Sequence, residues 1–116
     1  MTPEEFFVDY LNEHMDGVAA FGNEPDPAPP FFLTVEQVGG GGENQIDRAD
    51  IAVQSWAPSR AEAGQLNARV IEAMRASIED PRISRCHLDT TYHFTDTTKK
   101  RPRYQAVFEV VHFLGG

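Results

Sequence analysis

The sequence predicts an α+β domain in which a mostly antiparallel sheet of four to five strands carries two helices packed on one face. Two segments have apolar residues at helical spacing, and strand-like stretches lie in pairs on either side of the second segment. Each predicted helix is apolar along one stripe only, so each must pack against the strands. The predicted order is α-β-β-α-β-β, within one domain covering residues 1–116.

The first helix is predicted over residues 3–15. Thr2 and Glu5 have the spacing of a capping box, with a proline at the first helical position between them. Phe7, Leu11 and Met15 form the apolar stripe. The other side of this helix is acidic, and its carboxylates are Glu4, Glu5, Asp9 and Glu13.

A first pair of strands is predicted after a proline-rich stretch. Residues 18–22 are consistent with a short strand, and the four prolines within residues 23–30 predict an extended linker. The pair itself covers residues 31–38 and 46–56 and is antiparallel. Its tip is predicted to be a flexible contact loop, too long for a tight hairpin, containing Gly39, Gly40, Gly41 and Gly42.

The second helix is predicted to begin at Ser59, which forms a capping box with Glu62, and to end before Pro81. Its apolar stripe consists of Ala63, Leu66, Val70, Met74 and Ile78. A second pair of strands follows at residues 85–94 and 104–113. The last strand is apolar on nearly both faces, which places it inside the sheet.

Charge is unevenly distributed along the chain. The net charge is −8, residues 1–47 hold ten carboxylates and no Lys or Arg, and every basic residue lies from Arg48 onward. This balance argues against non-specific binding to DNA or to an anionic membrane, and we expect no membrane and no sequence-specific nucleic acid among the partners. No stretch approaches the roughly 20 apolar residues of a membrane helix. The single cysteine, Cys86, is expected to be a buried structural thiol in a protein made in the cytoplasm.

No pattern of a catalytic, metal or cofactor site emerges from the residues. His87, Asp89 and His93 would share a strand face, but the two histidines would lie about 20 Å apart, too far for one ion. Cys86 and His87 would point to opposite faces. We therefore expect no enzyme activity and no cofactor. A small-ligand pocket using His87, Asp89 and Tyr92 is the alternative.

Three segments together resemble a known family. These are the Phe-Phe-Leu-Thr-Val strand after the prolines, residues 49–57 (Ala-Asp-Ile-Ala-Val-Gln-Ser-Trp-Ala), and the helix that follows over residues 61–70. The chain resembles the tail terminator (tail completion, minor tail protein U-like) family of long-tailed bacteriophages. The resemblance spans most of the chain, and a neighbouring head–neck connector or closure protein is the alternative.

The resemblance implies a structural protein of the virion. Members of this family form a ring, usually a hexamer, on the head-proximal end of the tail tube, where they end tube polymerisation and provide the surface for joining the head. The implied partners are other copies of the chain, the tail tube protein and a head–tail connector protein. We expect the acidic first helix of one copy to approach a basic loop of the next, with residues Lys99, Lys100, Arg101 and Arg103.

Overall fold

The computed structural model describes residues 1–43, 46–94 and 101–114. Within these residues one sheet has the strand order β1-β2-β3-β5-β4. β1 runs parallel to β2, and every other neighbouring pair is antiparallel. The strands are β1 (Ala19–Phe21), β2 (Phe32–Glu43), β3 (Ile46–Trp56), β4 (Ile83–Phe94) and β5 (Arg103–His112).

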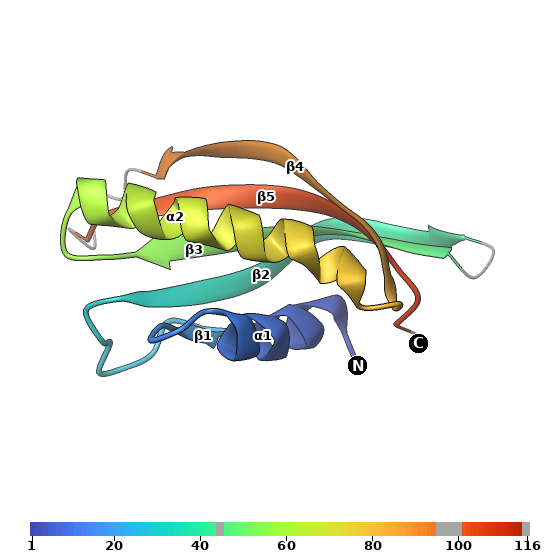
Figure 1. Ribbon diagram of the computed structural model, residues 1–116, viewed down its shortest axis with the longest axis horizontal. Coiled ribbons are helices and arrows are strands. Elements are labelled where there is room, and N and C mark those ends of the chain that lie inside the picture. Colours follow the sequence, from blue (N-terminus) through green and yellow to red (C-terminus); the bar gives the residue numbers. More distant parts are fainter. Residues whose placement is uncertain (44–45, 95–100, 115–116) are drawn as a thin grey trace.

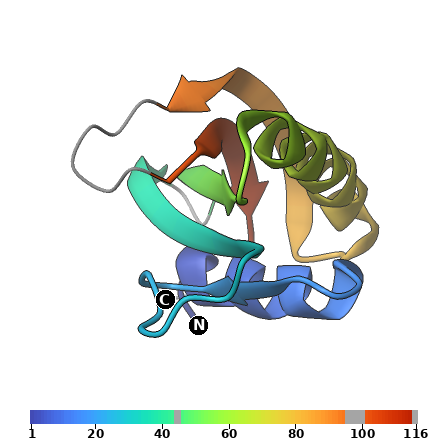
Figure 2. The same cartoon turned by 90° about the vertical axis from the view of Figure 1, so that its left-hand side faces the viewer.

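Two helices cover one face of this sheet (Figure 1). Helix α1 (Pro3–His14) lies beside β1 and β2, and α2 (Arg60–Arg75) lies over β3, β5 and β4. A 3₁₀ turn, η1 (Ala76–Glu79), extends α2 toward β4. The view along the long axis shows both helices on the same side of the strands (Figure 2). The predicted α+β fold is confirmed, and β5 lies inside the sheet as expected.

The core forms where the helix stripes meet the helix-facing side of the sheet. Phe7 and Leu11 of α1 and Val70 of α2 are fully buried, as are Ile51 and Phe108 of the central strands. Burial of a side chain of this size contributes about 1.5–3 kcal/mol. The predicted stripes therefore account for the position of both helices.

Ile78 is the exception, because its side chain is 54% exposed and does not continue the α2 stripe. The helix tightens into η1 after Arg75, and a 3₁₀ turn has three residues per turn where an α-helix has 3.6. This change rotates Ile78 toward solvent and buries Ser77, whose hydroxyl donates to the carbonyl oxygen of Met74 at 2.6 Å.

Both predicted helix caps are present, one of them in altered form. Thr2 accepts from the backbone N–H of Glu5, and the Glu5 carboxylate accepts from the backbone N–H of Thr2. Ser59 likewise accepts from the N–H of Glu62, but the Glu62 carboxylate accepts from the Ser59 hydroxyl instead of its backbone. Each cap satisfies donors that the first helical turn leaves unpaired.

The prediction that the four glycines form a loop at the tip of the hairpin is wrong. The four glycines belong to β2, where they pair with residues of β3: Gly39 with Asp50, Gly40 with Ala49, Gly41 with Arg48 and Gly42 with Asp47. A register shift between Gln37 and Gly39 precedes them. Gly40 has φ +128°, and a Cβ there would overlap the carbonyl oxygen of Arg48. Glycine is used here for a strained strand conformation and a close approach of backbones.

Two glycine substitutions test whether the strained backbone and close contact at Gly40 require glycine. We expect Gly40→Ala to lower the free energy of unfolding by about 1–3 kcal/mol, because it adds a Cβ at positive φ against the β3 backbone. Gly41→Ala is the matched control, since a Cβ there meets nothing within 4 Å. Urea denaturation measures both variants, and equal stabilities would contradict this account of the hairpin.

Candidate functional site

The four carboxylates predicted as an acidic surface divide into two pairs. Glu4 accepts from the backbone N–H of Gln37 at 2.9 Å and so fastens α1 to β2. Glu5 is occupied by the cap of its own helix, and hydrogen bonds with Thr2 lower its pKa. Asp9 and Glu13 have no hydrogen bond or ion pair with another described residue. The acidic side of α1 that is free for a partner therefore consists of Asp9 and Glu13.

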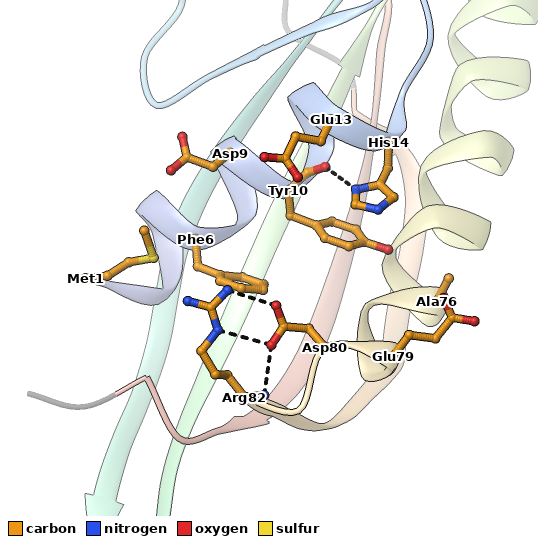
Figure 3. A pocket seen from close by; sticks show the side chains of 10 residues that line it. All are labelled: Met1, Phe6, Asp9, Tyr10, Glu13, His14, Ala76, Glu79, Asp80 and Arg82. Carbon is orange, nitrogen blue, oxygen red and sulfur yellow. Dashed lines mark hydrogen bonds and ion pairs between the residues drawn. The ribbon is translucent and has the colours of Figure 1, made fainter.

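Asp9 and Glu13 lie at the edge of a recess between α1 and η1 (Figure 3). The recess has a volume of about 420 Å³. The rings of Phe6 and Tyr10 stack along one wall at 6.1 Å between centroids, and the His14 ring stacks on Tyr10 at 4.1 Å. The recess thus combines an aromatic wall with carboxylates at its rim.

Hydrogen bonds hold two of these rings in place. The Tyr10 hydroxyl donates to the carbonyl oxygen of Ala73 in α2 at 2.6 Å, which joins the two helices. His14 Nδ1 lies 2.8 Å from the carbonyl oxygen of Tyr10, so this nitrogen carries the proton. Burial raises the pKa of Tyr10, and the negative charge of Glu79 adds to the effect.

One guanidinium of the chain already lies in this recess. Arg82 donates from Nε and Nη2 to the two carboxylate oxygens of Asp80, at 3.1 and 2.8 Å, and its guanidinium lies 5.0 Å from the Phe6 ring centroid. These hydrogen bonds lower the pKa of Asp80 to about 2, so the ion pair persists to low pH. The recess therefore suits a planar cation between an aromatic ring and a carboxylate.

Only part of the predicted basic loop lies within the described residues. Lys99 and Lys100 lie outside the described residues. Arg101 Nη2 donates to the carbonyl oxygens of Pro29 and Pro30, at 2.6 and 2.9 Å. This arginine serves the chain itself, because it ties the second hairpin to the proline-rich linker across the end of the sheet.

Arg103 is also engaged within the chain. Its guanidinium carbon lies 4.4 Å from the Trp56 ring centroid and 3.9 Å from that of Phe94. Trp56 in turn stacks on Phe32 at 5.3 Å, with the two ring planes 8° apart. Phe32, Trp56, Arg103 and Phe94 are register partners on four adjacent strands, and we call this row the cation–aromatic rung.

A second row, the amide rung, lies beside it and was not predicted. Its members Thr34, Gln54, Gln105 and Tyr92 are also register partners on β2, β3, β5 and β4. Thr34 donates to Gln54 at 2.6 Å, Gln54 to Gln105 at 2.7 Å, and Gln105 to the Tyr92 hydroxyl at 2.6 Å. The Trp56 indole N–H donates to Thr34 and joins the two rungs. Because these polar groups satisfy one another, the rungs lock four strands in register.

The predicted histidine arrangement is wrong. β4 has an extra residue between Leu88 and Thr90, so His87 pairs with Glu109 whereas His93 pairs with Tyr104. Partners five residues apart on β5 lie on opposite faces, which separates the two histidines. No group of three potential metal-binding His, Cys, Asp or Glu side chains occurs in the described part of the chain.

Cys86 is partly buried on β4, and burial raises its pKa to about 11.

Among the described residues, neither helix has the length and hydropathy of a membrane-spanning helix. No protein-family model and no curated protein matches the chain. The resemblance to the tail terminators stays a prediction from the sequence.

The amide rung gives a first prediction for this region. Gln54→Ala should lower the free energy of unfolding by about 2–3 kcal/mol, because it removes the acceptor of the buried Thr34 hydroxyl and the donor to the Gln105 side-chain oxygen. Gln65→Ala, at an exposed position on α2, should change the free energy by less than about 0.5 kcal/mol. Chemical denaturation of both variants measures these free energies. An unchanged free energy of unfolding for Gln54→Ala would contradict the structural role of the amide rung.

The Cys86 thiol gives a second prediction, on pH. The thiol stays protonated in the folded protein up to about pH 11. At pH 8 we expect iodoacetamide to modify it at least ~10-fold more slowly in the folded than in the denatured chain, since the thiolate is the reactive form. Its folded-state pKa exceeds the ordinary value of 9.0, so folding stability should also fall as pH rises from 9 toward 11. Equal modification rates would contradict the burial of this thiol.

Proposed function

We propose that the chain is a structural protein that assembles with copies of itself into a hexameric ring on the head-proximal end of a phage tail tube. The observation that carries this proposal is that exposed charges of opposite sign lie on different elements of the subunit. Asp9 and Glu13 lie on the α1 side, whereas Arg75 and Arg85 lie on α2 and β4. A closed ring joins one patch of each copy to a different patch of the next, and this arrangement of charge suits such a contact.

The polar clusters inside the fold also favour a structural role. The cation–aromatic and amide rungs are engaged within the sheet and hold its strands together. The alternative small-ligand cluster does not converge: His87 and Tyr92 are register partners of Glu109 and Gln105, which places them about 13 Å apart along the strand. Among the described residues, the exposed charges and the projecting ends of the strands are available to a partner.

In this proposal the β2–β3 hairpin contacts the tail tube. Its far end extends past both helices along the long axis of the molecule (Figure 1). The exposed Val38 lies on β2 just before the four glycines. An extended hairpin with a narrow glycine edge can approach the backbone of a partner closely.

Tube assembly tests the proposal directly. The purified chain is added to the tail tube protein encoded in the same genome while that protein polymerises, and the tubes are measured by negative-stain electron microscopy. We expect shorter tubes with a ring at one end only. Tubes of unchanged length with bare ends would contradict the proposal, and binding to the head–tail connector without tube ends would favour a neck protein.

A further inference from the structure

The sheet face opposite the helices, which we call the open face, carries charges from three strands. Figure 2 shows both helices on the other side of the strands. Side chains alternate between the two faces of a strand, and Ala49 and Ile51 of β3 belong to the helix-facing core. Arg48 and Asp50 of the same strand therefore lie on the open face.

Strand register extends these two positions into two rows across β3, β5 and β4. The acidic row consists of the register partners Asp50, Glu109 and His87. The basic row consists of the register partners Arg48, Val111 and Arg85. The rows are neighbours on the open face, about 7 Å apart along the strands. Charges of one sign therefore lie across the strands, and charges of opposite sign follow one another along them.

The two rows do not neutralise each other within the subunit. Asp50 and Glu109 are half-buried and Arg48 and Arg85 are exposed, and none of the four has an ion pair or a side-chain hydrogen bond with another described residue. Like charges directly opposite each other on paired strands destabilise a sheet. The pairing of Asp50 with Glu109 therefore lowers the stability of the single subunit, and a cationic group placed over this face would offset that loss.

An exposed apolar side chain lies at the end of the same face. Phe113 follows β5, and its N–H donates to the carbonyl oxygen of Arg82 at 2.8 Å, which continues the pairing by one residue. His112 is buried and Leu114 packs against the core, so Phe113 between them points to the open face, where it is 51% exposed. Val107 lies on that face of the same strand and is half-buried. The open face thus combines charged rows with an apolar contact surface.

We propose that the open faces of two copies pack against each other about a two-fold axis that crosses the strands between the acidic row and the basic row. This axis places the acidic row of each copy on the basic row of the other, so the contact is made twice. It passes midway between Glu109 and Val111, and it therefore also places Phe113 of one copy over Val107 of the other. Sheets packed face to face lie about 10 Å apart, a distance that facing arginine and carboxylate side chains span together.

A second copy fits this face because the two rows exchange places under the two-fold rotation. A small cation would neutralise the acidic row but would leave Arg48, Arg85 and Phe113 without a partner. The contact also goes beyond the proposed ring. An isologous contact joins two copies and then stops, whereas a ring needs a heterologous contact.

Charge reversal tests the pair. One variant carries Asp50→Lys and Glu109→Lys, a second carries Arg48→Glu and Arg85→Glu, and a third carries all four changes. Each of the first two should self-associate at least ~10-fold more weakly than the wild type, because like charges then face each other. Their equimolar mixture should pair, and the third variant should pair with itself, since its rows have only exchanged places. Sedimentation velocity measures the masses, and high salt should weaken the wild-type pair.

Controls keep the outcome specific. Arg60→Glu with Glu72→Lys reverses two exposed charges of α2, on the other side of the sheet, and should leave pairing unchanged. Phe113→Ala should weaken pairing at every salt concentration, because it removes apolar contact area. Circular dichroism and melting temperature verify that every variant folds. A wild-type chain that stays monomeric, or association that the row variants leave unchanged, would overturn the pair.

The pair and the proposed function can fail separately. A monomeric chain that still caps tubes would overturn the pair and leave the proposed function. If the row variants of such a chain lose binding to tube ends, the tube protein covers the open face instead of a second copy. Pairs that follow the charge pattern, in a chain that never binds tube ends, would support the pair and overturn the proposed function.

Discussion

The structure depends on burying the apolar stripes of two helices against one face of a single sheet. Val70 and Leu11 are fully buried there with Ile51 and Phe108, and this burial positions both helices on the sheet. Apolar area removed from water is the dominant favourable contribution in such a domain. Because both helices occupy the same face, no helix of the described residues covers the other face, and its buried polar side chains find their partners within the sheet.

The two rungs supply these partners. Thr34 and Gln54 are only 7% and 8% exposed although neither described helix covers them, and their hydrogen bonds run directly across the strands. The neighbouring row places the Arg103 guanidinium between two aromatic rings. Polar groups buried in this way are stable only when each one has a partner, so the rungs also specify the register.

The helix-covered face has a different consequence for function. Each helix packs on its own set of strands, α1 beside β2 and α2 over β5, and the space between them stays open as a groove. Tyr10 bridges that space through its hydrogen bond to Ala73. Asp9, Glu13 and Glu79 are exposed charges at the rim of this groove.

The sequence by itself determined the features that depend on near neighbours. The caps at Thr2 and Ser59, the α1 stripe and the central position of β5 follow from capping chemistry and periodicity, which act within a few residues. Only the tertiary structure decided the rest: the bulge that separates His87 from His93, the pairing of Gly40 in β2, and the internal partners of Arg101. These depend on backbone and side-chain contacts between segments far apart in the chain, which no local pattern contains.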